Sequence, residues 1–177
     1  MNNTLMTGFL EMFREMKKRG GSALEQLSPD QLSWRPNANS NSVAVIVGHL
    51  HGNMRSRWTD FLTGDGEKSW RNRDAEFELE PAAEQVLTLW EEGWATVFAA
   101  LEPLTDADLE KKILIREREL SVFTAIVRQI DHYGGHIGQI VYLAKWMKGP
   151  DWKTLSIARG ESKNYVPHSS WLEGQKE

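Results

Sequence analysis

The sequence predicts an all-α protein in which long helices form a bundle. Four stretches repeat apolar residues at three- and four-residue steps, which is the period of a helix with one buried face. The alternation typical of a strand is confined to residues 113–120 and is weak there. Four long amphipathic helices without a convincing sheet favour a helical bundle, because each helix covers its apolar face with a neighbouring helix.

The first two predicted helices lie in the N-terminal part of the chain. One covers about residues 4–27, and Ser28-Pro29 then provides a cap and a first-turn proline, which predict one short turn. The second helix begins after Ser40 or Ser42. It ends at a long connection, residues 63–80, and a loop of that length in a compact domain is usually functional or mobile.

The last two predicted helices follow this connection. The third begins at Pro81 and has the clearest pattern, with one apolar face formed by Val86, Leu87, Trp90, Trp94, Val97, Phe98 and Leu101. The fourth runs from about Ser121 to Lys148, where Gly149-Pro150 ends it. The predicted bundle therefore covers about residues 4–148, with its long connection between the second and third helices.

Composition limits the functions open to this chain. Its 177 residues fit a single domain, residues 1–177, with an irregular tail at 151–177. A net charge of −4 argues against a nucleic-acid partner, which would require a basic face. The chain has no cysteine, so a bound metal must use histidine and oxygen ligands. Neither a signal peptide nor a membrane span is recognisable, so we expect a cytoplasmic protein without a membrane partner.

Two of the five histidines, His132 and His136, are the most informative. Side chains four residues apart on a helix lie one turn apart on the same side, where two imidazoles can bind one ion. Their sector of the helix faces the bundle interior, where imidazoles need polar partners. A shared metal supplies such a partner, and hydrogen-bonded structural histidines are the alternative interpretation. Glycines at positions 134, 135 and 138 indicate close helix contact or ligand access beside the pair.

A third ligand is expected from the second helix, which carries both His49 and His51. Two residues apart on a helix, they point about 160° away from each other and cannot both serve one site. His49 is preferred, because it shares its face with a polar strip formed by Ser42, Asn53, Ser56 and Asp60. His51 lies at the opposite margin of the apolar stripe, and His168 is expected at the surface of the tail.

Three imidazoles leave at least one coordination position open, as in catalytic rather than structural metal sites. They suit Zn²⁺ or Ni²⁺, with Fe²⁺ and Mn²⁺ as alternatives. A water bound to such an ion would have its pKa lowered toward about 7. Tyr133 directly follows His132 where a metalloprotease helix has Glu, which argues against that type of peptide hydrolysis.

Two blocks of sequence resemble the DinB-like (YfiT-like) four-helix-bundle superfamily, in particular an uncharacterised bacterial branch. The blocks are residues 47–62 with 65–74, and residues 128–139 with 151–153 and 156–160. They place a histidine in the second helix and His-Tyr-Gly-Gly-His in the fourth. The resemblance implies an up-down-down-up bundle, often a homodimer, and a metal triad formed here by His49, His132 and His136. His51 matches no ligand of the family.

The resemblance also implies a function. Some members of the superfamily transfer low-molecular-weight thiols such as mycothiol or bacillithiol and use a metal to activate the thiolate, while others have no known activity. A metal-dependent thiol transferase or a small-molecule hydrolase is one hypothesis, and a non-catalytic, stress-associated metal- or ligand-binding protein is the other. The chain has no cysteine, so the thiol must be a cosubstrate.

Residues near the expected site are candidates for holding a substrate. They are Asn53, Arg71, Arg73 and Arg159. The arginines could bind an anionic group, and an ordinary surface role is the alternative. No catalytic general base is assigned, because Asp131 points about 100° away from His132 on the helix.

Overall fold

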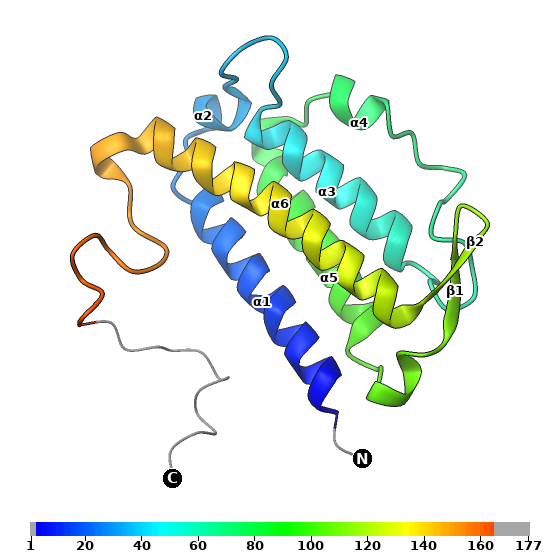
Figure 1. Ribbon diagram of the computed structural model, residues 1–177. Helices are drawn as coiled ribbons and strands as arrows, with labels where there is room; N and C mark the ends of the chain where they lie inside the picture. The colour runs from blue at the N-terminus through cyan, green and yellow to red at the C-terminus, as the bar shows by residue number, and fades with distance from the viewer. Residues whose placement is uncertain (1–2, 165–177) are drawn as a thin grey trace.

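The computed structural model describes residues 3–164 and is mostly helical (Figure 1). Its four long helices are α1 (Thr4–Leu24), α3 (Val43–Trp58), α5 (Val86–Leu101) and α6 (Val122–Lys148). The shorter helical segments are α2 (Pro29–Ser33), α4 (Ala75–Glu78) and the 3₁₀ turns Ala83–Gln85, Asp106–Asp108 and Gly149–Asp151. The long helices lie side by side, with α3 packed mainly on α5 and α1 mainly on α6.

Serine caps explain where several helices begin. The hydroxyl of Ser42 accepts a hydrogen bond from the first turn of α3, and that of Ser121 does the same for α6. Ser28 forms a capping box with Gln31 in front of α2. At the C-terminal end of α6, Gly149 has a φ of 51°, a left-handed conformation that ends the helix where the sequence predicts.

Two helix boundaries differ from the prediction. The helix α3 ends at Trp58 rather than near residue 62, because Thr59 is extended and Asp60 adopts a φ of 50°. The helix α1 ends at Leu24 rather than near residue 27, and it runs on through Gly20. A Cβ at Gly20 would overlap the ring of Trp90, so this glycine permits close contact between α1 and α5.

The all-α prediction needs correction, because the structure also contains a small sheet. Strands β1 (Lys112–Ile115) and β2 (Arg118–Ser121) form an antiparallel hairpin. Its two turn residues, Arg116 and Glu117, both have positive φ, as the tightest hairpin turns require. Neither is a glycine or an asparagine, so the turn lacked its usual sequence signal.

Asp65 in the long connection holds this turn in place. Its carboxylate accepts hydrogen bonds from the backbone N–H groups of Glu67, Arg116 and Glu117 at 2.7–2.8 Å. These bonds lower the pKa of Asp65 despite the opposing effect of burial. The long connection between α3 and α5 is therefore fastened to the hairpin that precedes α6.

Replacing Asp65 with alanine is expected to lower the free energy of unfolding by about 1 kcal/mol, because three backbone donors lose their acceptor. Urea denaturation followed by circular dichroism measures the change. Asp74→Ala is the matched control, since Asp74 lies in the same connection and makes no side-chain cap hydrogen bond. Equal effects of the two substitutions would show that Asp65 does not fasten the connection.

An aromatic cluster fills the centre of the bundle. Each ring in this cluster has its centroid within 6.5 Å of the centroid of at least one other ring, and the members are Phe13, Trp58, Trp94 and Tyr133. Tyr133 is fully buried, and its hydroxyl accepts a hydrogen bond from the indole of Trp58 at 3.0 Å. With Tyr133 anchored in the core, the neighbouring His132 is held on the side of α6 that faces α3.

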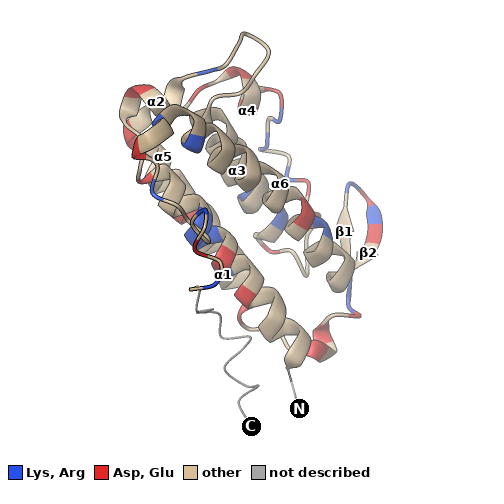
Figure 2. Ribbon diagram, turned by 60° about the vertical axis from the view of Figure 1, so that its left-hand side comes forward, with Lys and Arg blue, Asp and Glu red and all other residues tan. Residues whose placement is uncertain are grey.

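No helix among the described residues is both long enough and apolar enough to span a membrane. In Figure 2, acidic and basic residues are interspersed over α1 and the β1–β2 hairpin.

Candidate metal centre

Three histidines from two helices meet at one point between α3 and α6. One nitrogen each of His49, His132 and His136 lies within 4.8 Å of the other two. Nε2 of His49 is 3.2 Å from Nε2 of His132. Ligand nitrogens about 2.0–2.1 Å from a tetrahedral zinc ion are separated by roughly 3.3 Å. The spacing of His49 and His132 therefore suits a shared divalent ion, and His136 lies within reach of the same point.

Hydrogen bonds orient two of the three imidazoles. Nδ1 of His49 donates to the carboxylate of Glu76 at 2.9 Å, and Nδ1 of His136 donates to Oε1 of Gln139 at 2.8 Å. A proton on Nδ1 leaves the lone pair on Nε2, the nitrogen that then faces a metal. Nδ1 of His132 is buried without a hydrogen-bond partner among the described residues. The set of donors thus fits an ion bound through Nε2 atoms.

Two of the imidazoles, those of His132 and His136, have a lowered pKa, which favours the neutral form that metal binding requires. Burial lowers the pKa of His132 to about 4, and the neighbouring His136 and His49 add to this effect. Burial also lowers the pKa of His136. At neutral pH neither His132 nor His136 carries a proton that a metal ion would have to displace.

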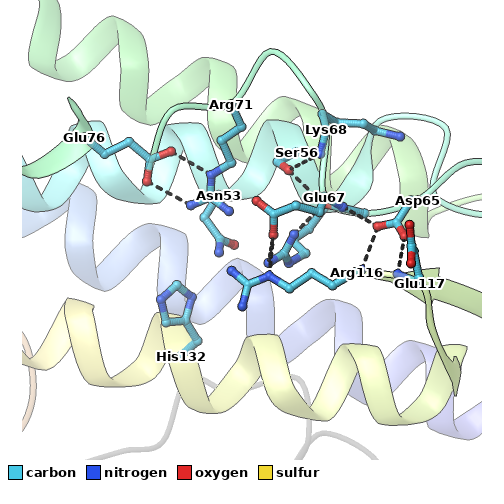
Figure 3. A network of polar contacts seen from close by, with 12 residues as sticks. Asn53, Ser56, Asp65, Glu67, Lys68, Arg71, Glu76, Arg116, Glu117 and His132 are labelled. Carbon is cyan, nitrogen blue, oxygen red and sulfur yellow. Dashed lines mark hydrogen bonds and ion pairs between the residues drawn. The ribbon is translucent and has the colours of Figure 1, made fainter. Parts of the chain in front are cut away.

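The short helix α4 covers His49 from outside the bundle. Glu76 binds Nδ1 of this histidine, and the ring of Phe77 stacks on the imidazole with centroids 4.6 Å apart. Glu76 also accepts two hydrogen bonds from Arg71, from Nε at 2.7 Å and from Nη2 at 2.8 Å (Figure 3). Burial raises the pKa of Glu76, but the bonds from Arg71 and His49 outweigh it and leave the carboxylate ionised.

The sequence contains little that points to Glu76. It lies 27 residues from His49, in a connection without helical period. Its role becomes visible only when α4 is folded over α3. Gly52 is part of the reason that this contact exists, because a Cβ there would lie 2.9 Å from Cδ of Glu76 and closer still to its Oε1.

Replacing Gly52 with alanine should displace Glu76 and lower metal affinity about 10-fold, the lower end of the range for a disturbed outer-shell partner. A Gly→Ala substitution in a helix usually raises the free energy of unfolding by about 1 kcal/mol, and Gly52→Ala should not show this gain. Metal titration by isothermal calorimetry and urea denaturation measure the two effects. Gly8→Ala in α1 is the control, because a Cβ there meets no atom within 4 Å. Unchanged affinity in Gly52→Ala would contradict the packing argument.

Comparisons with known proteins identify a family and a similar fold. The family model "Protein of unknown function (DUF1572)" matches residues 2–161 of the chain. The chain belongs to the DUF1572 family. A solved structure of a DinB-like protein of Bacillus subtilis, YjoA, has a similar fold, with a TM-score of 0.64 and 17% identity over 83% of this chain and 96% of that one. No curated protein matches. The prediction of an uncharacterised family with a DinB-like fold is confirmed.

The four residues predicted to hold a substrate do not lie together. Asn53 is buried, and its Oδ1 accepts a hydrogen bond from the hydroxyl of Tyr133 at 3.2 Å. Arg71 joins the cluster through Glu76, and its side chain is 1% exposed. Arg73 and Arg159 are exposed.

His51 is not part of the triad. Nε2 of His51 points toward α5 and lies 3.2 Å from a carboxylate oxygen of Glu92, as its place on the other margin of α3 predicts. His168 lies outside the described residues. At Gly135 and Gly138 a Cβ would meet no atom within 4 Å, so close helix packing does not explain these two glycines.

A second group of charged residues lies beside the triad and ties the connection to the hairpin (Figure 3). Glu67 forms ion pairs with Arg57 at 3.2 Å and with Arg116 at 2.8 Å. Arg57 also donates to the backbone carbonyl of Gly66. The positive charges of Arg71 and Arg57 both lower the pKa of His132, so this charged group lies close to the triad.

Proposed function

We propose that the protein binds one divalent metal ion, Zn²⁺ or Ni²⁺, through His49, His132 and His136 and is a metal-dependent transferase of low-molecular-weight thiols. The observation that carries this proposal is a set of three converging imidazoles without a fourth protein ligand. In residues 3–164, no additional His, Asp or Glu joins the group. Structural zinc sites are normally closed by four protein ligands, whereas sites with an open position bind substrates.

An ion at this site would supply a Lewis acid that lowers the pKa of a bound thiol or water. The protein's own residues orient the ligands. Glu76 fixes the tautomer of His49, and Arg71 fixes Glu76. Asn53 and Arg71 are our proposed contacts for the substrate, since both lie next to the imidazoles. Arg73 and Arg159 are proposed only for substrates that extend to the surface.

Transfer of a thiol is preferred over hydrolysis because of the resemblance to DinB-like proteins. The thiol would come from a cosubstrate, because the chain has no cysteine. The alternative function is a non-catalytic metal- or ligand-binding protein. We also propose that the four long helices run in up-down-down-up order and that the protein is a cytoplasmic homodimer. Light scattering during gel filtration measures the oligomeric state.

The test begins with elemental analysis of the purified protein. We expect one divalent ion per chain, and turnover when small thiols are supplied with an electrophile such as monochlorobimane. Bound metal without turnover, together with a lower melting temperature after metal removal, would favour the non-catalytic alternative. Protein that binds no divalent ion even in metal-replete buffer would refute both functions.

A further inference from the structure

A cavity lies at the end of the bundle where α2 meets the C-terminal end of α6 (Figure 1). Its volume is about 360 Å³, near the lower end of the range for small-molecule sites. Two segments line it, α2 with the residue that follows it and the last turn of α6, through Asp30, Gln31, Trp34, Trp146 and Met147. The cavity is separate from the candidate metal centre, because His136 lies ten residues before Trp146, about 15 Å along the axis of α6.

Two tryptophan rings form adjacent walls of this cavity. The ring centroids of Trp34 and Trp146 are 5.6 Å apart, and the ring planes make an angle of 78°. Both residues are exposed, Trp34 by 39% and Trp146 by 58%, although tryptophan is usually highly buried. The ring of Trp146 also contacts that of Tyr142, one helical turn earlier, with centroids 6.3 Å apart. Two electron-rich indole rings are therefore held nearly at right angles beside an exposed cavity.

The charge of the lining favours a cation. Of the described residues that line the cavity, Asp30 alone is charged, and Lys145 and Lys148 on either side of Trp146 in the sequence lie outside the lining. Within residues 3–164, the carboxylate of Asp30 forms neither an ion pair nor a hydrogen bond. A positive charge near an indole face is attracted by the electron density of the ring, and the carboxylate adds a Coulombic attraction.

The hydrogen-bonding groups of the lining indicate which kind of cation fits. Oε1 of Gln31 already accepts a hydrogen bond from the backbone N–H of Ser28 at 3.0 Å. Indole N–H groups only donate, and the thioether of Met147 is a weak acceptor. A primary ammonium has three N–H donors and would find a strong, free acceptor only in Asp30. A quaternary ammonium has no N–H donor, and its methyl groups can contact the two rings and the thioether.

We infer that this cavity binds a small, soluble quaternary ammonium compound, that is, a molecule with a trimethylammonium group. The rings of Trp34 and Trp146 contact the methyl groups, and Asp30 balances the charge. Met147 closes the inner side, because its partly buried side chain packs against the hydrophobic core. The inference is independent of the proposed metal-binding function and gives the protein a second ligand site at the far end of α6.

Three small alcohols provide the probes. Choline carries a trimethylammonium group, 3,3-dimethylbutan-1-ol has the same shape with a carbon atom in place of the charged nitrogen, and ethanolamine carries a primary ammonium. The full-length protein is titrated with each by isothermal calorimetry. We expect choline to bind about 10-fold tighter than the neutral alcohol, because only choline gains the attraction of the rings and of Asp30. Ethanolamine should also bind about 10-fold more weakly than choline, because two of its three N–H donors lack a strong acceptor.

Two variants and a control locate the binding site. Trp146→Leu keeps an apolar side chain but removes the ring, so choline should bind no more tightly than the neutral alcohol. Asp30→Asn should weaken choline about 3-fold, as expected for an exposed charge pair, and leave binding of the neutral alcohol unchanged. The control is Trp70→Leu, which removes a tryptophan that is 54% exposed beside Arg55 and should leave choline binding unchanged.

Several results would overturn the inference. Equal affinities for choline and the neutral alcohol would show an apolar cavity without selectivity for a cation, and undiminished choline binding in Trp146→Leu would place the ligand elsewhere. Cosedimentation with phosphatidylcholine vesicles that Trp146→Leu abolishes would assign the cavity to a lipid headgroup instead of a small soluble ligand. If choline does not bind and Trp146→Leu converts a dimer into a monomer during gel filtration, the two tryptophans form a contact between copies of the chain.

Discussion

Replacement of any one of His49, His132 or His136 with alanine is expected to abolish stoichiometric metal binding. Structural zinc sites with four ligands contribute about 10–16 kcal/mol, so one ligand accounts for roughly 3 kcal/mol, or more than a 100-fold change in affinity. The metal content of dialysed protein, measured by inductively coupled plasma mass spectrometry, should fall from one ion per chain to less than a tenth of an ion per chain. Any thiol transfer should disappear with it.

The matched control is His51→Ala. It removes an imidazole from the same helix, two residues from His49, and leaves the triad intact. This variant should retain one ion per chain. Circular dichroism checks that each alanine variant is still helical. Metal content that falls as much in His51→Ala as in His49→Ala would place the ion elsewhere or make the loss a consequence of unfolding.

Metal removal should also destabilise the parent protein. At a free ion concentration 100 times the dissociation constant, binding stabilises the folded state by about 2.7 kcal/mol. For a chain of this size, that corresponds to a fall of roughly 5–10 °C in melting temperature when a chelator is added. The triad variants should melt at the same temperature with and without the chelator.

The second large effect is expected at Glu76. Glu76→Ala should lower metal affinity 10- to 100-fold, because His49 loses the acceptor that fixes its tautomer. It should also cost about 3–5 kcal/mol of stability, since Arg71, whose side chain is 1% exposed, is left as a buried cation without its partner. Calorimetric metal titration and urea denaturation measure these two effects separately.

Two further variants separate the effect of the hydrogen-bond acceptor at position 76 from the effect of its charge. Glu76→Gln keeps an acceptor for Nδ1 of His49 and should preserve more of the metal affinity than Glu76→Ala. The double variant Arg71→Met with Glu76→Leu removes both charges and should recover much of the lost stability, without recovering metal affinity. Full metal affinity in the double variant would show that Glu76 has no influence on the ligand.

The histidine cluster was predictable because helical geometry is local. The four-residue spacing of His132 and His136 and the positions of His49 and His51 on one helix follow from 100° per residue. The partners of these histidines were not predictable in the same way. Glu76 and Arg71 lie in a connection whose path depends on contacts with the hairpin, and such contacts join residues far apart in the sequence.

The same reasoning explains the errors in the fold. Local periodicity located the four long helices, but it extended α3 beyond Trp58 because Phe61 continues the apolar pattern. The sequence indicated the β1–β2 hairpin only weakly, because its two turn residues are not of the types that usually mark a tight turn. That turn is held by Asp65, which lies 51 residues from Arg116 in the sequence.

The separation of the histidines along the chain affects the order in which folding and metal binding can occur. His49 and His132 are 83 residues apart, so an ion bound to both closes a large loop of the chain. In the unfolded chain only the neighbouring pair on α6 could meet an ion, and with low affinity. The complete site forms after α3 and α6 have packed together. Metal loading would therefore follow folding, and a bound ion would then slow the separation of these two helices.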